Sequence, residues 1–171
     1  MTFRRTLFVP LFLIVLLAAV AIPAAGATTP AVFTLTVGGL SISAPSTTAD
    51  FGTQSVSNSA QTITGSLGPV TVSDQRGGVT TWTASVISTA FTPTAGPAVG
   101  AVAVSYNPGA FTASGVVPTR IVASDLTGVT PVVSGASSGV STVTWNPTIS
   151  ILVPANFAAG VYTATITHSV A

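Results

Sequence analysis

Apolar and polar residues alternate with a period of two along most of the chain after residue 30. In VYTATITHSV (161–170) the alternation places Tyr162 and His168 on the apolar face and threonine or serine on the other. VTTWTASV (79–86) repeats the pattern and puts Trp82 on its apolar face. This period, together with the many β-branched residues, predicts strands that bury one face and leave the other in water.

Groups of glycine and proline separate the alternating stretches, and they predict turns because glycine adopts positive φ and proline fixes φ. SGASSG, which begins at residue 134, is one such group. We expect strands near residues 31–37, 60–66, 69–74, 79–88, 99–106, 119–123, 130–134, 140–145, 148–153 and 160–169. The remaining serine- and proline-rich residues 41–50 are expected to form a loop. No stretch after the first residues has the apolar spacing of an amphipathic helix. The prediction is therefore an all-β protein, an antiparallel β-sandwich of Greek-key, immunoglobulin-like type.

The first residues have the features of an export signal. Arg4 and Arg5 precede the apolar stretch LFVPLFLIVLLAAVAI (7–22), and Pro23 and a run of small residues follow. We expect residues 1–27 to be a cleaved signal peptide and residues 28–171 to form a single domain. An uncleaved membrane anchor is the alternative, since the apolar stretch approaches the length of a membrane span.

Charge is scarce after residue 27, where two arginines stand against three aspartates, with no lysine and no glutamate. Two arginines cannot neutralise the phosphates of a nucleic acid, nor can they form a polybasic contact with lipid headgroups. The chain contains no cysteine, so it has neither a disulfide nor a site for an acyl anchor. We therefore expect no nucleic-acid partner, and no membrane contact once the signal is removed.

The residue types needed for catalysis are not grouped in the sequence. Asp50, Asp74 and Asp125 lie near three separate turns rather than together in the sequence. A single histidine and no cysteine leave no metal-ligand pattern, and no calcium-loop motif is present. The sequence predicts a protein that is not an enzyme and that has no cofactor and no metal site.

Three aromatic side chains fall on apolar strand faces: Trp82, Trp145 and His168. Core packing is the expected role of both tryptophans. We expect His168 to lie at the edge of the core with its ring nitrogens bonded to backbone groups. The alternative for His168 is a contact residue at one end of the sandwich.

Asp74 and Arg76 stand two positions apart in VSDQRGG (72–78), so their side chains project to the same face or to the same rim. Because each charge is costly near a core without its partner, we expect an ion pair that holds a hairpin before the Trp82 strand. A polar contact for a ligand at the rim is the alternative.

These residues resemble the WxL family of bacterial cell-surface proteins. VSDQRGG resembles the Asp-x-Arg-Gly segment of that family, TWTAS (81–85) stands at its first Trp-x-Leu motif, and AGVYTATITHSVA (159–171) resembles its closing strand. Two positions depart from the pattern: Ala84 replaces the motif leucine, and His168 stands where a second tryptophan is expected. The resemblance implies an exported β-rich domain that associates non-covalently with peptidoglycan or with partner surface proteins.

Two functions remain open from the sequence. The first is a secreted, non-catalytic domain that binds the cell wall or a partner envelope protein. The second is a structural subunit that assembles with copies of itself into a surface layer, fibre or matrix, since no lysine protects the strand edges. The candidate ligand-binding residues are Asp74, Arg76, Trp82, Tyr162 and His168.

Overall fold

The computed structural model describes residues 29–171, so the predicted signal peptide, residues 1–27, lies outside the described residues. All strands of the described residues belong to the compact unit Leu35–Ala171. The strands are β1 (Leu40–Ser43), β2 (Gln61–Ser66), β3 (Val70–Asp74), β4 (Val79–Ser88), β5 (Thr92–Pro93), β6 (Val104–Asn107), β7 (Phe111–Arg120), β8 (Thr130–Trp145), β9 (Thr148–Val153), β10 (Tyr162–Thr163) and β11 (Ile166–Val170). Among the described residues the helical content is limited to the short 3-10 turn η1 (Ala101–Ala103).

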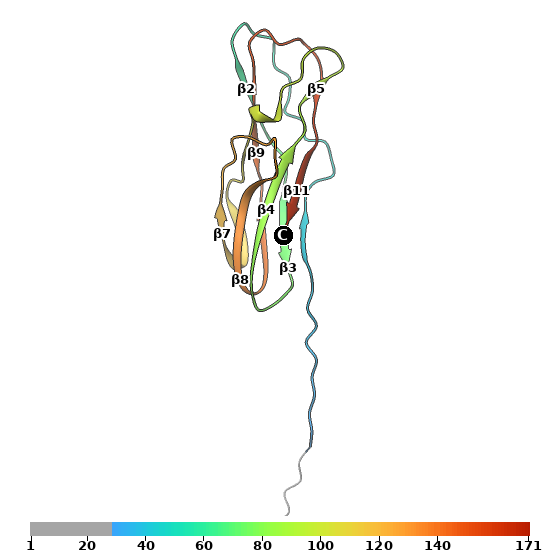
Figure 1. Ribbon diagram of the computed structural model, residues 1–171, viewed down its shortest axis with the longest axis vertical. Coiled ribbons are helices and arrows are strands. Elements are labelled where there is room, and N and C mark those ends of the chain that lie inside the picture. The colour runs from blue at the N-terminus through green and yellow to red at the C-terminus, as the bar shows by residue number, and fades with distance from the viewer. Residues whose placement is uncertain (1–28) are drawn as a thin grey trace, which may run out of the picture. The chain divides into compact units, whose positions relative to one another are not determined.

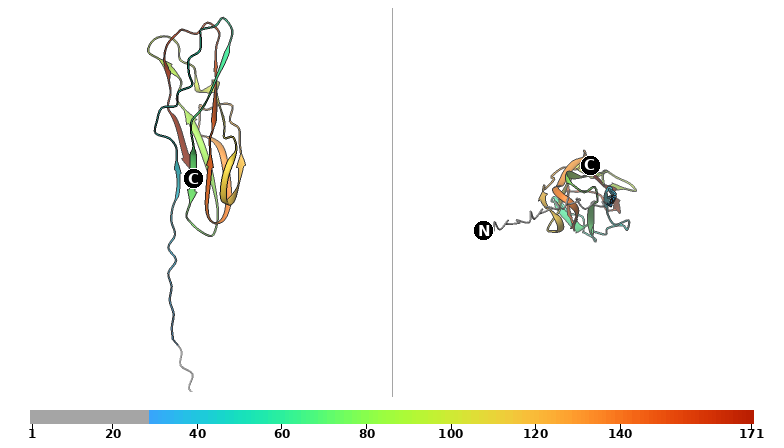
Figure 2. Two further views of the ribbon diagram at one scale, coloured as in Figure 1. Left: turned by 180° about the vertical axis from the view of Figure 1, so that it is seen from behind. Right: turned by 90° about the horizontal axis from the view of Figure 1, so that it is seen from below.

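All strand pairings are antiparallel, which confirms the predicted fold class (Figure 1). The largest sheet has the order β1-β3-β8-β4-β11, and β7 pairs with the other edge of β8. A three-stranded sheet, β2-β9-β6, and a small β10-β5 pair complete the fold (Figure 2). Strands that are distant in sequence are thus neighbours in the sheets, as in other Greek-key sandwiches.

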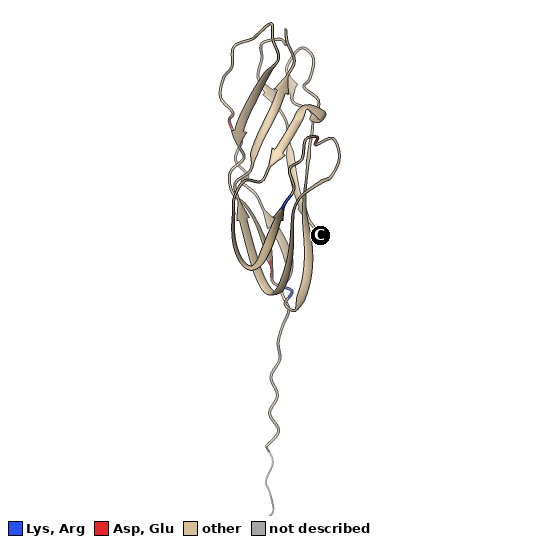
Figure 3. Ribbon diagram, turned by 90° about the vertical axis from the view of Figure 1, so that its left-hand side faces the viewer, with Lys and Arg blue, Asp and Glu red and all other residues tan. Residues whose placement is uncertain are grey.

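The larger sheet bends back on itself through β8. The residues of β8 up to Ser138 pair with β4, whereas the residues from Ser141 onwards pair with β3. β7 pairs with both halves of β8. The pairing register shifts between Ser114 and Val116, at Gly115, which has φ +74°. Figure 3 shows the strands reversing at this end. Strands that pass from one layer to the other at a bend are a recognised way to make the corner of a sandwich. We call this corner the closed end.

The alternation of apolar and polar residues explains which side chains form the core between the layers. Val70 and Val72 of β3, Trp82 and Val86 of β4, and Trp145 of β8 are each at most 2% exposed. On β4 the alternate residues Thr81, Thr83 and Ser85 remain in contact with solvent. The strands near 60–66, 69–74, 79–88 and 148–153 are therefore confirmed, and so is the inward direction of both tryptophans.

Several other expected elements are wrong. Residues 31–37 form no strand, and the first strand, β1, begins at Leu40 and overlaps the expected loop at 41–50. SGASSG forms no turn between strands, because residues 134–138 continue the ladder with β4 and the irregularity follows at Gly139. Of the strand expected at 119–123, only residues 119–120 are in a strand, as the end of β7, and Ala123 makes an isolated bridge to Tyr106.

Candidate functional site

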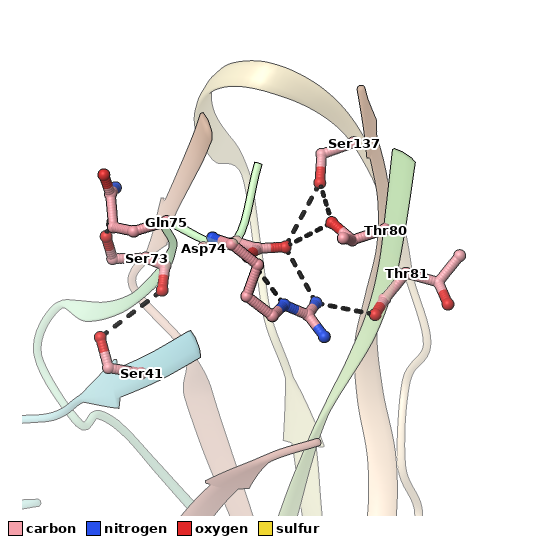
Figure 4. A network of polar contacts seen from close by, with 8 residues as sticks. Ser41, Ser73, Asp74, Gln75, Thr80, Thr81 and Ser137 are labelled. Atoms are coloured by element: carbon pink, nitrogen blue, oxygen red, sulfur yellow. Dashed lines mark hydrogen bonds and ion pairs between the residues drawn. The ribbon is translucent and has the colours of Figure 1, made fainter. Parts of the chain in front are cut away.

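The carboxylate of Asp74 lies at the closed end, fully buried and surrounded by hydrogen-bond donors (Figure 4). Arg76 binds it with Nε 2.9 Å from Oδ1 and Nη2 2.9 Å from Oδ2, and the backbone N–H of Arg76 donates to Oδ1 at 3.1 Å. The Thr80 hydroxyl donates to Oδ2 at 2.8 Å, and the Ser137 hydroxyl lies 3.4 Å from the same oxygen. Nη2 of Arg76 also donates to the carbonyl oxygen of Thr81 at 2.9 Å. The predicted ion pair is therefore confirmed.

Local sequence explains this geometry. Asp74 ends β3 on its inward face, and the glycines that follow, Gly77 and Gly78, both have φ +70°, which lets the chain reverse tightly enough to bring Arg76 back onto the carboxylate. The hydrogen bonds from Arg76 and Thr80 hold the pKa of Asp74 well below its usual range despite its burial. A carboxylate this fully occupied has little capacity left for a ligand, so its contacts join β3, β4 and β8 rather than face solvent.

Trp82 packs against a glycine of the neighbouring strand. Its register partner on β8 is Gly135, and a Cβ added there would lie 2.5 Å from Cζ2 of Trp82. Only 2% of Trp82 is exposed, and its Nε1 has no hydrogen-bond partner in the described part of the chain. Trp82 therefore acts as a core residue that β8 accommodates by having no side chain at the contact.

His168 takes part in a chain of hydrogen bonds with Tyr106 and Trp145. Nε1 of Trp145 donates to the hydroxyl of Tyr106 at 2.8 Å, and this hydroxyl lies 3.1 Å from Nε2 of His168. The rings of Tyr106 and His168 meet edge to face, with centroids 5.6 Å apart. His168 is half-buried at the edge of the core, as expected, but the bond recorded for its ring is to a tyrosine hydroxyl rather than to the backbone.

The direction of these bonds follows from the donor that begins the chain. An indole nitrogen can only donate, so the Tyr106 oxygen accepts from Trp145 and its own proton is free to go to His168. When the Tyr106 hydroxyl donates to His168, Nε2 is the unprotonated ring nitrogen and the ring proton is on Nδ1. Burial lowers the pKa of His168 and raises that of Tyr106, which favours this neutral arrangement.

Tyr162 lies apart from both clusters, on β10, which pairs with β5. Its hydroxyl donates to the carbonyl oxygen of Ala158 at 2.8 Å, and its ring lies 6.1 Å from that of Phe157, centroid to centroid. Both rings are half-buried, so each keeps part of its surface in solvent. We call Phe157 and Tyr162 the aromatic pair.

The five candidate residues do not form one site: Asp74, Arg76 and Trp82 lie near one another, whereas His168 and Tyr162 lie elsewhere. Asp74 and Arg76 are in contact, Trp82 begins just beyond the Thr81 carbonyl that Arg76 binds, and His168 and Tyr162 have other partners. Asp74 and Trp82 are buried, whereas the Arg76 side chain is 34% exposed.

Sequence reasoning missed three further residues that complete these contacts. In the sequence, Tyr106 could be found only as a residue on the same inward face as Val104 in an alternating stretch. Phe157 stands in an irregular loop with no pattern to mark it. Arg120 lies over the ring of Phe111, 5.6 Å from its centroid, a cation–π contact between the two ends of β7.

The fold and these contacts define a class of protein, the antiparallel β-sandwich. Its charged and aromatic side chains hold strands together, as they do in binding and structural domains. A family model described as "WxL domain surface cell wall-binding" matches residues 22–171. The chain belongs to the WxL family, which confirms the resemblance and assigns the protein to the cell surface in a wall-associating role. The searches of curated proteins and of solved structures found no match.

The stretches that carry the resemblance lie on strands that pair with one another. Ala84 is 1% exposed and pairs with Val170 of β11. His168 pairs with Val86 of β4. Residues 29–171 contain no cluster of potential metal ligands, and none of their helices has the length and apolarity needed to span a membrane.

Proposed function

We propose that this protein is a secreted, non-catalytic domain that binds peptidoglycan non-covalently, and that the aromatic pair is its contact surface. The observation that carries the wall-binding role is the family match over residues 22–171. The choice of surface rests on exposure, because Phe157 and Tyr162 are adjacent aromatic rings that both reach solvent.

The chemistry of a glycan favours such a surface. A sugar ring presents a face of C–H groups that packs against the electron-rich face of an aromatic ring. The bond from Tyr162 to the carbonyl of Ala158 fixes the ring before binding, so little rotamer freedom remains to be lost. The other candidate residues then have supporting roles: Asp74, Arg76 and Trp82 hold the closed end, and His168 holds β11 against Tyr106.

We also propose that the chain is cleaved during export. Residues 1–27 are an export signal that is removed, and residues 28–171 fold as one domain. Mass spectrometry of the protein recovered from the culture medium tests this step. A mass that corresponds to a start near residue 28 supports it, and a retained apolar segment would indicate an anchor instead.

Sedimentation with isolated cell walls tests the binding surface. We expect Tyr162→Ala and Phe157→Ala each to weaken binding on the order of tenfold, which corresponds to about 1.4 kcal/mol. Tyr162→Phe keeps the ring and removes only the bond to Ala158, so it should weaken binding less than Tyr162→Ala; Val161→Ala is the control for an exposed neighbour. Unchanged binding by both alanine variants would reject the aromatic pair, and wild-type protein that stays in the supernatant would reject wall binding. Recovery of one envelope protein, without wall polymer, would favour the partner-protein alternative.

A further inference from the structure

We propose that residues 31–37, which we call the arm, add as a β-strand to the free edge of β7 in a second copy of this chain. The proposal is independent of wall binding. It joins a strand-like segment and a strand edge that pair with no other strand within residues 29–171.

The arm has the composition of a strand that should be half-buried. AVFTLTV carries no charge and no proline, and it places Ala31, Phe33, Leu35 and Val37 on one face. Yet Phe33 is 85% exposed, Leu35 86% and Val37 80%. Apolar side chains in such a row are normally covered by a neighbouring strand or another molecule.

The strand order leaves nothing beside the arm in its own sheet. The ladder between β1 and β3 continues to Gly38, whose N–H donates to the carbonyl of Gln75, and to Gly39, whose carbonyl accepts from Gln75. The chain then turns away through Gly77 and Gly78. The strand that pairs with β1, β3, therefore does not continue alongside the arm, whose last residue is Val37.

The free edge of β7 can receive a strand of this length. β7 runs from Phe111 to Arg120, and in residues 29–171 its one ladder is the one with β8. Arg120 is its only charged residue, and Pro118 removes one backbone donor while leaving its carbonyl to accept. Val117 is 85% exposed, and beside it a shallow hollow extends across β8 to Val79 of β4. The edge thus offers backbone groups and apolar side chains together, which is what strand addition uses.

The length of the arm favours pairing with β7 of a second copy rather than with β7 of the same chain. Along the later half of β8 the order is β1-β3-β8-β7, so β1 and β7 lie at opposite edges. Three strand spacings amount to about 14 Å, and an extended chain needs about four residues to cover that distance. The crossing would use most of the arm and leave too few residues to pair. An arm that pairs along its whole length must therefore reach another molecule, and because donor and acceptor surfaces differ, the contact repeats head to tail.

The oligomeric state of the secreted protein, followed by size-exclusion chromatography with light scattering over a concentration series, tests the proposal. We expect the wild type to form dimers and longer species as concentration rises. Leu35→Lys should remove the donor and Val117→Lys the acceptor, since a lysine at either place opposes strand addition. Both side chains are exposed, so circular dichroism should show unchanged folding, and Val161→Lys, at another exposed valine, should assemble like the wild type.

Mixing the two variants gives the sharpest outcome. Leu35→Lys keeps its β7 edge and Val117→Lys keeps its arm, so the mixture should form dimers and stop there. A wild type that stays monomeric at the highest concentration, assembly that survives either lysine, or a mixture without dimers would each overturn the proposal.

Discussion

The hydroxyl of Tyr106 lies 3.1 Å from Nε2 of His168, and this contact joins the β6–β9 sheet to the last strand of the larger sheet. Trp145 donates to the Tyr106 oxygen. A neutral histidine at 168 can accept the tyrosine proton, which a tryptophan could not do because an indole only donates.

Tyr106→Phe removes the hydroxyl that both neighbours use. Nε1 of Trp145 would stay buried without a partner, and such a group costs about 1–3 kcal/mol. We expect the free energy of unfolding, measured with urea at pH 7, to fall by that amount. No loss would show that the hydroxyl contributes nothing to stability.

The stability of the protein should depend on the protonation of His168. Burial lowers its pKa in the folded state, so the unfolded chain binds the proton more readily. The contribution is complete above the ordinary value of 6.5 and is lost as the pH falls below it, with a slope of at most about 1.4 kcal/mol per pH unit.

His168→Gln keeps an acceptor for Tyr106 but cannot titrate. Urea unfolding between pH 7 and pH 5 should show falling stability for the wild type and a flatter profile for the variant. Because the chain has a single histidine, equal slopes for both proteins would contradict this assignment.

Asp74→Asn should destabilise the closed end. The substitution removes the charge from hydrogen bonds with Arg76 and Thr80, and hydrogen bonds to charged groups are worth about 1.5–3 kcal/mol. We expect a loss of that order at pH 7 in urea unfolding. Asp125→Asn is the matched control, since Asp125 is exposed and accepts from the backbone N–H of Thr127.

The contribution of Asp74 to stability also depends on pH, but its pKa is lowered mainly by the hydrogen bond from Arg76, whereas that of His168 is lowered by burial. The pKa of Asp74 is lowered by folding, so its stabilising effect is present above the unfolded value of 3.8 and is lost as the pH falls below it. The difference between wild type and Asp74→Asn should therefore shrink below pH 4. A difference that stays constant down to pH 2 would show that the charge of Asp74 is not what stabilises the turn.

Gly135→Ala tests the contact with Trp82. Its Cβ would lie 2.5 Å from the indole, and over-packing of this kind costs about 1–3 kcal/mol. Gly128→Ala is the control, because a Cβ there meets nothing within 4 Å. We expect thermal unfolding to shift for Gly135→Ala and to stay nearly unchanged for Gly128→Ala; equal shifts would mean that the indole tolerates the methyl group.

Local chemistry was sufficient to predict part of this structure. Alternation fixes which face of a strand is buried, so the extent of β4 and the inward direction of Trp82 followed from sequence. The Asp74–Arg76 pair followed as well, because its partners are two residues apart and charge is scarce elsewhere.

The rest depends on contacts between distant residues. Alternation in residues 31–37 predicts a strand, but a strand forms only where another runs beside it. The small residues of SGASSG resemble a turn, yet Gly135 is small because the ring of Trp82 covers it. Tyr106 and His168 are 62 positions apart, and no local pattern links them.

We propose that Trp82 and Trp145 support the fold, whereas the aromatic pair meets the wall. Solution NMR of the labelled secreted protein, titrated with soluble peptidoglycan fragments, distinguishes these roles. We expect the ring signals of Phe157 and Tyr162 to shift on binding, and the indole N–H signals of Trp82 and Trp145 to keep their positions. Shifts at the indoles and at the Asp74–Arg76 turn, with Tyr162 unaffected, would show that the wall binds at the closed end instead.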